Sequence, residues 1–402
     1  MTESTTCVIA GGGPAGMVLG LLLARAGVEV TLLEKHADFL RDFRGDTVHP
    51  STLRLLDDLG LWHRFAQLPQ SRVEQGALLV DGRPLTLVDF RRLRQRHRYI
   101  AMVPQWDLLN LLAEAARAEP SFTLRMSTEV TGLLRDGERV SGVAYRGPDG
   151  AGELSADLTV ACDGRWSLVR REAGLSTREW PVPFDVWWFR LPQEAPGQYS
   201  LIPRTAPGRV LIMIPREGYF QIAYLIPKGT DVALRARGLE TFRREVAELV
   251  PEADASHIQS WDDVKLLDAR LNRAQRWYTR GLLCIGDAAH AMSPVGGMGI
   301  NVAVQDAVGA ATLLAKPLRD GTVGTKDLAA VQRRRMPPAA VTQAIQRTLH
   351  RTLIGPILAG RDAEPPAAAV ALVRRLPWLT AIPAHVIGVG VRPERAPAFA
   401  RR

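Results

Sequence analysis

The sequence predicts an α/β fold in which a parallel sheet is assembled from separated parts of the chain, with a mainly antiparallel sheet inserted and helices at the C-terminal end. Residues 7–33 read as a strand, a glycine-rich turn, a helix and a second buried strand. Several runs of strand-forming residues follow one another between residues 181 and 262. A late apolar strand at residues 282–285 leads into a second glycine-rich loop, and helical spacing dominates after it.

Length and composition indicate a globular protein with one large domain and an elaboration. The chain has 402 residues, of which 46% are hydrophobic and 23% charged, and this balance excludes an intrinsically disordered protein. Lysine and arginine number 51 against 42 aspartates and glutamates, a net charge of +9. The excess is arginine dispersed along the chain, and the densest basic run, residues 91–98, has no interleaved aromatic residues. We therefore expect no nucleic-acid partner.

Cysteine and histidine usage narrows the class further. Cys7, Cys162 and Cys284 show no CxxC spacing, so we expect neither a disulfide framework nor a zinc site, and we predict a cytoplasmic protein. The histidines are scattered without ligand spacing, so no metal is expected. The N-terminal residues do not resemble a secretory signal. The most apolar late segment, residues 378–391, falls short of the ~20 residues that a membrane span requires.

The first glycine-rich turn predicts a bound dinucleotide. Gly11, Gly13 and Gly16 form a GxGxxG pattern between a strand and a helix, where glycines permit a tight turn and close approach of the backbone to a pyrophosphate. The N-terminus of the helix offers free N–H groups to the phosphates. Glu34 follows at the end of the second strand, where a carboxylate can accept hydrogen bonds from ribose hydroxyls.

The segments between the two glycine clusters alternate between strands and helices. We expect a strand at residues 99–103, a helix from about residue 106 to 118, and strands separated by turns from 122 to 162. Within the insertion, residues 186–189, 210–214 and 219–226 read as strands of an antiparallel sheet that lies over a ligand.

The second glycine cluster, residues 281–301, favours a flavin over a nicotinamide as the bound dinucleotide. A strand delivers Asp287 to a sheet edge, and a helix begins near Met298. The carboxylate suits sugar-alcohol hydroxyls, and a helix N-terminus suits a ring that becomes anionic on reduction. A flavin has both a ribityl chain and such a ring.

Three ordered motifs give the chain a specific resemblance. They are Gly11 to Gly16 with Glu34, then residues 161–170 around Asp163-Gly164, then Gly286-Asp287 with Pro294-Val295-Gly296-Gly297-Met298-Gly299. Together they resemble the signatures of the class A flavoprotein monooxygenases, the para-hydroxybenzoate hydroxylase-like family. The resemblance spans residues 11–301 and implies a discontinuous, Rossmann-like FAD-binding domain at residues 1–72, 98–180 and 263–345. Residues 73–97 and 181–262 would form the substrate-binding sheet, and residues 346–402 a helical C-terminal segment.

The resemblance also implies the cofactors and the chemistry. NADPH or NADH would reduce the flavin, O₂ would form a flavin C4a-hydroperoxide, and one oxygen atom would pass to an aromatic or polyketide-like small molecule. Pro294 and Gly296 would face the reacting part of the flavin. The protein would be a monomer or a homodimer. The residues expected to contact FAD are Gly11, Gly13, Pro14, Ala15, Gly16, Glu34, Lys35, Arg44, Gln105, Asp163, Gly286, Asp287, Pro294, Gly297, Met298, Gly299 and Asn301.

The substrate side is predicted from strand alternation alone. Alternation places Trp188 and Arg190 on one face of a strand, and Tyr219 and Gln221 on one face of another, where they would suit a flat, hydroxylated ligand. For each residue taken singly, ordinary sheet packing is the simpler explanation. His49 follows the Arg44 loop and could act as a base that deprotonates a phenol, although a structural histidine is the alternative.

Three other functions fit some of the motifs. Residues 187–192 are close to the WxWxIP tract of flavin-dependent halogenases, but Phe189 and Leu191 depart from it. A flavin reductase that inserts no oxygen would keep the same cofactor motifs. A non-catalytic protein that binds FAD and an effector would also keep them and would need no reductant.

Overall fold

The computed structural model describes residues 3–40, 47–80, 83–192, 200–201, 203–216, 218–361 and 367–402. Its largest sheet has 8 strands in the order β20-β21-β11-β1-β2-β8, with β10 and β9 continuing from β11. The strands of this sheet are β1 (Glu3–Ala10), β2 (Val30–Leu33), β8 (Phe122–Arg125), β9 (Glu129–Asp136), β10 (Arg139–Gly147), β11 (Gly150–Ala161), β20 (Tyr278–Thr279) and β21 (Leu282–Cys284). β1, β2, β8, β21 and the second half of β11 run parallel, as the βαβ unit predicts.

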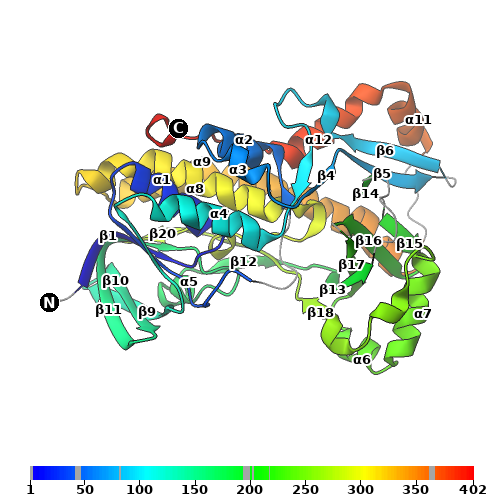
Figure 1. Ribbon diagram of the computed structural model, residues 1–402, viewed down its shortest axis with the longest axis horizontal. Helices are drawn as coiled ribbons and strands as arrows, with labels where there is room; N and C mark the ends of the chain where they lie inside the picture. The colour runs from blue at the N-terminus through cyan, green and yellow to red at the C-terminus, as the bar shows by residue number, and fades with distance from the viewer. Residues whose placement is uncertain are drawn as a thin grey trace.

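Long helices pack with the large sheet and contribute a large part of the main core. They are α1 (Pro14–Arg25), α4 (Gln105–Arg117), α8 (Met298–Arg319) and α9 (Thr325–Leu349). In Figure 1, α8 and α9 run across the molecule beside α1 and α4. The expected helix at 106–118 is α4, shifted by one residue. The small side chains Ala307, Ala310 and Ala311 are buried along α8, which lets α8 pack closely against its neighbours.

The inserted antiparallel sheet that the sequence predicts is confirmed, in the order β15-β16-β17-β13-β18. Its strands are β13 (Phe184–Pro192), β15 (Pro203–Ala206), β16 (Arg209–Pro215), β17 (Tyr219–Pro227) and β18 (Lys265–Leu267), and α6 (Asp231–Arg235) and α7 (Leu239–Leu249) follow β17. One face packs Trp187, Phe189 and Tyr224 against Phe242 of α7. The other face packs Val186, Val210 and Ala223 into a second apolar cluster that includes Ile354, which follows α9.

Smaller sheets and the C-terminal helices join these two layers. The small sheets consist of β3 (Thr47–Val48), β4 (Ser71–Val73) and β7 (Ile100–Met102); β5 (Gln75–Val80), β6 (Arg83–Asp89) and β14 (Ser200–Leu201); and β12 (Thr177–Trp180) and β19 (Leu271–Ala274). The remaining helices are α2 (Pro50–Asp58), α3 (Trp62–Phe65), α5 (Leu168–Glu172), α10 (Gly355–Leu358), α11 (Ala367–Arg375) and α12 (Ala381–Gly388). Figure 1 shows α11 and α12 beside the β5–β6 hairpin. The C-terminal segment is therefore helical, as predicted.

Among the described residues, one helix, Val295–Arg319, is long and apolar enough to cross a membrane by length and composition alone. Within the fold, 78% of its most apolar window is buried. Burial of this kind is what a core helix of a globular protein shows.

The register of the large sheet brings the sequence motifs to one edge. Ala10 lies opposite both Leu33 and Ala161, and Ala161 lies opposite Cys284. These four residues end four neighbouring parallel strands. The first glycine turn, Glu34, the Asp163-Gly164 motif and the Gly286-Asp287 motif follow them directly, at the carboxyl edge where ligands of open α/β sheets bind.

Candidate active site

The first glycine turn combines close backbone packing with one open position. A Cβ atom on Gly16 would lie 2.1 Å from the carbonyl oxygen of Gly11, so only glycine allows α1 to begin this close to β1. A Cβ atom on Gly13 would meet nothing within 4 Å. Gly13 caps the N-terminus of α1, and Pro14 at the next position supplies no N–H. The space in front of Gly13 therefore fits a ligand that approaches the backbone and the helix N-terminus.

Glu34 accepts a hydrogen bond from the backbone of this turn. Its Oε2 accepts a hydrogen bond of 2.8 Å from the Gly12 N–H, and its Oε1 accepts one of 3.1 Å from the His36 N–H. The residue is buried, whereas Lys35 is exposed. The carboxylate thus fixes the glycine turn to the end of β2, and ribose binding by Glu34 and a contact from Lys35 stay predictions.

The Gly286-Asp287 turn packs directly against the first motif. A Cβ atom on Gly286 would lie 3.2 Å from the Cβ atoms of both Ala15 and Ala303, so α1, α8 and this turn meet at small residues. The Asp287 carboxylate is partly exposed, with Oδ2 3.6 Å from Nη2 of Arg165. Asp287 therefore presents an accessible carboxylate beside the α1 turn, and its contact with a ribityl chain stays a prediction.

Asp163 has one satisfied oxygen and one unsatisfied oxygen. Oδ2 accepts a hydrogen bond of 3.1 Å from the Val169 N–H, at the start of α5. Oδ1 is buried and has no hydrogen-bond partner among the described residues. Burial raises the pKa of this carboxyl, although hydrogen bonds from Ser167 and from backbone N–H groups oppose the rise. An unsatisfied buried acceptor next to the glycine turn is the kind of group that a ligand or water completes.

A buried network of charged side chains accepts a hydrogen bond from the Gly286-Asp287 turn. Oδ2 of Asp306 lies 2.5 Å from Nε2 of His290 and accepts a hydrogen bond of 3.2 Å from the Gly286 N–H, while its Oδ1 accepts one of 3.0 Å from Nε of Arg335. Arg335 and Arg334 both contact Glu394 in the C-terminal segment. Sequence reasoning missed this network because no motif links its members.

The charges within the network compensate one another. Burial alone would raise the pKa of Asp306, but the charges and hydrogen bonds of His290 and Arg335 outweigh burial and hold that pKa below its ordinary value. Asp306 and Arg335 are almost fully buried, so each depends on the other for charge compensation.

The loop from Pro294 to Gly297 precedes α8 and turns through two left-handed glycines. Gly296 has a φ of 77° and Gly297 a φ of 62°, and Gly297 is the N-cap residue of α8. The Gly297 carbonyl accepts a hydrogen bond of 2.9 Å from Oγ1 of Thr47. The predicted flavin-facing loop is therefore held to the β3 segment and lies at a helix N-terminus, where a negatively charged ring is stabilised.

His49 links this loop to the C-terminal segment. Its Nε2 lies 3.0 Å from the Gly297 carbonyl oxygen and its Nδ1 lies 2.8 Å from the Ile387 carbonyl oxygen at the end of α12. A neutral ring carries one N–H and donates to one of these two oxygens. The ring is fully buried, and burial lowers the pKa of His49 to about 4 although both carbonyls oppose the change. The proposed role of His49 as a base stays a prediction.

Stability is expected to fall on acidification because of His49. The folded pKa of about 4 lies below the ordinary value of 6.5, so the unfolded chain binds the proton first. Stability is therefore highest above pH 6.5 and decreases as the pH falls toward 4, by roughly 3 kcal/mol. His350, whose pKa burial also lowers to about 4, contributes in the same window.

Urea unfolding between pH 7 and pH 4.5 measures this effect. His49→Gln should show a shallower decrease of the free energy of unfolding with falling pH than the unsubstituted chain. His350→Gln serves as the matched variant and should remove the contribution of His350 to the pH dependence of the free energy of unfolding. An unchanged slope in His49→Gln would contradict the buried neutral imidazole.

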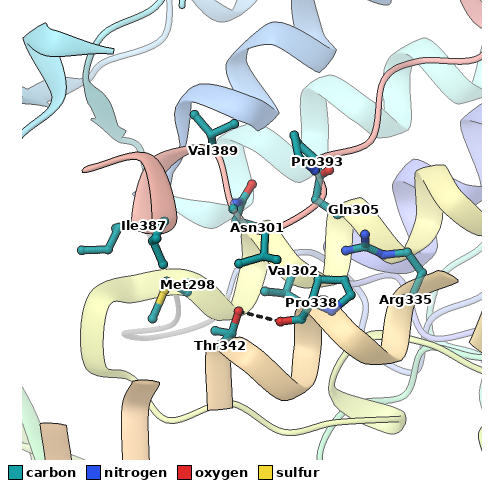
Figure 2. A pocket seen from close by; sticks show the side chains of 13 residues that line it. Met298, Asn301, Val302, Gln305, Arg335, Pro338, Thr342, Ile387, Val389 and Pro393 are labelled. Atoms are coloured by element: carbon teal, nitrogen blue, oxygen red, sulfur yellow. Dashed lines mark hydrogen bonds between the residues drawn. The ribbon is translucent and has the colours of Figure 1, made fainter. Parts of the chain in front are cut away.

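Asn301 and Gln105 lie near the loop in different ways. Oδ1 of Asn301 accepts hydrogen bonds of 2.6 and 3.0 Å from the hydroxyls of Ser51 and Thr52, so this side chain joins α8 to α2. Figure 2 shows Met298 and Asn301 in one pocket with Ile387 of the C-terminal segment. Gln105 is the first residue of α4 and is half-buried. Gly299 is the second residue of α8 and lies beside Met292, and Arg44 lies outside the described residues. Cofactor contacts by these residues stay predictions.

The four substrate-side residues share one face of the inserted sheet. Arg190 pairs with Gln221 across β13 and β17, and the Arg190 guanidinium lies 5.1 Å from the ring centroid of Tyr219. Nε2 of Gln221 donates a hydrogen bond of 3.0 Å to the Phe189 carbonyl. Trp188 packs into the same apolar cluster as Val295 of the flavin-facing loop. The loop and this face of the sheet therefore border one apolar cluster, and substrate contacts by the four residues stay predictions.

The donor set fits an FAD molecule, on the evidence of the open position at Gly13, the unsatisfied Oδ1 of Asp163 and the left-handed loop at the start of α8. The first two features follow the carboxyl ends of β1 and β11, where ligands of open α/β sheets bind, and the third lies at the N-terminus of α8. The described parts of the chain hold no group of three or more histidine, cysteine, aspartate or glutamate residues that could bind a metal ion.

Comparisons with known proteins agree with this arrangement. The family described as FAD binding domain matches residues 4–346. The chain is 35% identical over 379 residues to 6-methylpretetramide 4-monooxygenase of Streptomyces rimosus, covering 93% of this chain and 90% of that one. It is 25% identical over 343 residues to para-nitrophenol 4-monooxygenase of Pseudomonas sp. strain WBC-3, covering 82% of each.

A solved structure shows the same fold. The anhydrotetracycline hydroxylase OxyS of Streptomyces rimosus superposes with a TM-score of 0.76 at 25% sequence identity, covering 97% of this chain and 77% of that chain. The named relatives are oxygen-inserting enzymes that act on aromatic or polyketide compounds.

Proposed function

The chain belongs to the FAD-binding-domain family and is an FAD-dependent monooxygenase, and from this premise we propose that it hydroxylates a fused-ring, polyketide-type aromatic compound at the expense of NAD(P)H. The overall reaction balances as substrate C–H, O₂, NAD(P)H and a proton giving C–OH, water and NAD(P)⁺. The observation that carries the proposal is that Trp188 of the inserted sheet and Val295 of the loop before α8 pack against the same apolar cluster. The reductase and the non-catalytic alternatives are not favoured.

The bound flavin supplies two-electron chemistry with a nicotinamide and with O₂. The chain supplies binding, orientation and electrostatics. The N-termini of α1 and α8 place partial positive charge toward the diphosphate and toward the ring. Asp287 would hold the ribityl hydroxyls, and the Pro294–Gly297 loop would set the distance between the ring and the substrate.

A polycyclic aromatic substrate suits the inserted sheet. Trp188, Ile212 and Ala223 form an apolar surface on the face toward the loop, with Arg190 and Gln221 as polar groups at one end. An apolar wall with a few polar groups at one end orients a flat molecule that carries hydroxyl or carbonyl groups. The higher identity to the 6-methylpretetramide enzyme than to the para-nitrophenol enzyme supports a fused-ring substrate over a single ring.

The FAD-loaded protein should be incubated with NADPH or NADH, ¹⁸O₂ and either a tetracyclic polyketide or a simple phenol. We expect one ¹⁸O atom in the product of the tetracyclic compound and one NAD(P)⁺ for each product molecule. Addition of hydrogen without oxygen would show a reductase, and no consumption of NAD(P)H would contradict the proposal. Cytoplasmic location and a monomeric or homodimeric state belong to the same proposal.

A further inference from the structure

Three guanidinium groups surround one tryptophan on the β12–β19 ribbon. The guanidinium carbons of Arg178, Arg273 and Arg347 lie 5.4, 5.2 and 5.3 Å from the ring centroid of Trp180. Arg178 and Arg273 stand directly opposite each other in the antiparallel pair. Like charges at opposite positions destabilise a sheet, so this arrangement needs a compensating group. The indole supplies part of the compensation through cation–π contacts.

No carboxylate completes the compensation. In the described parts of the chain, the side chains of Arg178, Arg273 and Arg347 form no ion pair, and their one hydrogen bond is that of 3.1 Å from Nη1 of Arg273 to Oε1 of Gln343. A nearby arginine, Arg270, does have carboxylate partners. Arg270 lies within ion-pair distance of both Asp268 and Glu179, and alternation places Glu179 on the ribbon face opposite to Arg178.

A second polar group in the cluster also lacks a partner. Nε1 of Trp180 is buried and has no hydrogen-bond partner among the described residues. The Trp180 ring itself is partly exposed, and Arg178 and Arg347 are exposed. The cluster therefore offers positive charge, an unused N–H donor and an accessible aromatic surface at one place.

The cluster lies next to the flavin-facing loop. Gln346, which precedes Arg347 on α9, donates hydrogen bonds of 2.8 and 2.9 Å to the carbonyls of Ser293 and Val295. Trp180 and Val295 pack into the same apolar cluster. A ligand anchored at the arginines therefore starts beside the loop at which the flavin ring is expected.

We propose that Arg178, Arg273 and Arg347, arranged around Trp180, bind the phosphate groups of the pyridine nucleotide that reduces the flavin. Arginine recognises phosphate by charge-assisted, bidentate hydrogen bonds. Trp180 provides a surface for stacking of the adenine or the nicotinamide. The inference rests on the proposed use of NAD(P)H and identifies the side chains that would bind the phosphates of that nucleotide.

The test uses the FAD-loaded protein and the double variant Arg178→Gln/Arg347→Gln. Binding of NADP⁺, NAD⁺ and 2′,5′-ADP is measured by calorimetry, and flavin reduction by NADPH is followed anaerobically at increasing NADPH concentration. We expect NADP⁺ to bind roughly 100-fold more weakly in the double variant. The limiting rate of flavin reduction and the flavin content should stay unchanged. A loss confined to NADP⁺ and 2′,5′-ADP assigns the cluster to the 2′-phosphate, and an equal loss for NAD⁺ assigns it to the diphosphate.

The matched control is Arg280→Gln, which removes an exposed arginine that lies 3.6 Å from Glu138 at the edge of the large sheet. Arg280→Gln should bind NADP⁺ as the unsubstituted protein does. Normal NADP⁺ binding by the double variant would overturn the site. If the unsubstituted protein itself neither binds nor is reduced by any pyridine nucleotide, the proposed reductant fails as well, so the two failures are distinguishable.

Discussion

Replacing Gly13 with aspartate is expected to abolish FAD binding and to leave the apo fold intact. A Cβ atom at Gly13 meets nothing within 4 Å, so the aspartate side chain fits the apo protein without a clash. The same space lies in front of the α1 N-terminus, where we expect the diphosphate. An aspartate there adds bulk and a like charge. Because a juxtaposed like charge costs several kcal/mol, FAD affinity should fall at least roughly 100-fold.

The flavin content of the purified variant and the quenching of FAD fluorescence on titration measure this effect. Thermal unfolding of the apo protein, followed by circular dichroism, should match the unsubstituted chain. Gly13→Ala adds a methyl group without charge and should weaken FAD binding less than Gly13→Asp. A full complement of FAD in Gly13→Asp would contradict the placement of the diphosphate.

Gly16→Ala separates folding from ligand binding. Its Cβ atom would lie 2.1 Å from the Gly11 carbonyl oxygen, so α1 must shift away from the turn. We expect this variant to lose both apo stability and FAD. The contrast between positions 13 and 16 assigns one glycine to the ligand and the other to packing.

Local motifs made much of the fold and the FAD side of the site predictable. Gly11, Gly16 and Glu34 act within one βαβ unit, and their spacing alone indicates the turn and the carboxylate beside it. The carboxyl edge of a parallel sheet then brings Asp163 and Asp287 to the same place. The register between Ala10, Ala161 and Cys284 confirms the parallel pairing that this reasoning requires.

Contacts between distant parts of the chain were not predictable. His290, Asp306, Arg335 and Glu394 come from the second glycine cluster, two helices and the C-terminal segment, and only tertiary packing brings them together. The link from His49 to the Ile387 carbonyl has the same origin. The basic cluster was hidden for another reason. Composition showed an arginine excess, but dispersed arginines along the chain do not indicate which of them meet around Trp180.

Asp306→Asn is expected to lower the free energy of unfolding by about 3–5 kcal/mol, because it removes the nearer of the two carboxylates that compensate the buried Arg335 and leaves only the longer contact with Glu394. The Gly286 N–H also loses a carboxylate acceptor, so FAD affinity should decrease. Asp320→Asn is the matched control at the exposed end of α8. Asp320 pairs with Lys316 in solvent, and its substitution should change stability by less than about 1 kcal/mol.

The pH dependence and a double variant test whether charge is the cause. The pKa of Asp306 is lowered in the fold, so its contribution is present above the ordinary carboxyl pKa and is lost as the pH falls through the folded value. The difference between the unsubstituted chain and Asp306→Asn, measured by urea unfolding, should therefore shrink on acidification. Adding Arg335→Met to Asp306→Asn removes the buried cation that has lost Asp306 and should recover part of the lost stability, since Glu394 keeps its contact with Arg334. The result that would contradict this coupling is a double variant less stable than Asp306→Asn by as much as Arg335→Met alone destabilises the unsubstituted chain. The two residues would then act independently, and the buried network would not couple the Gly286-Asp287 turn to α9 and the C-terminal segment.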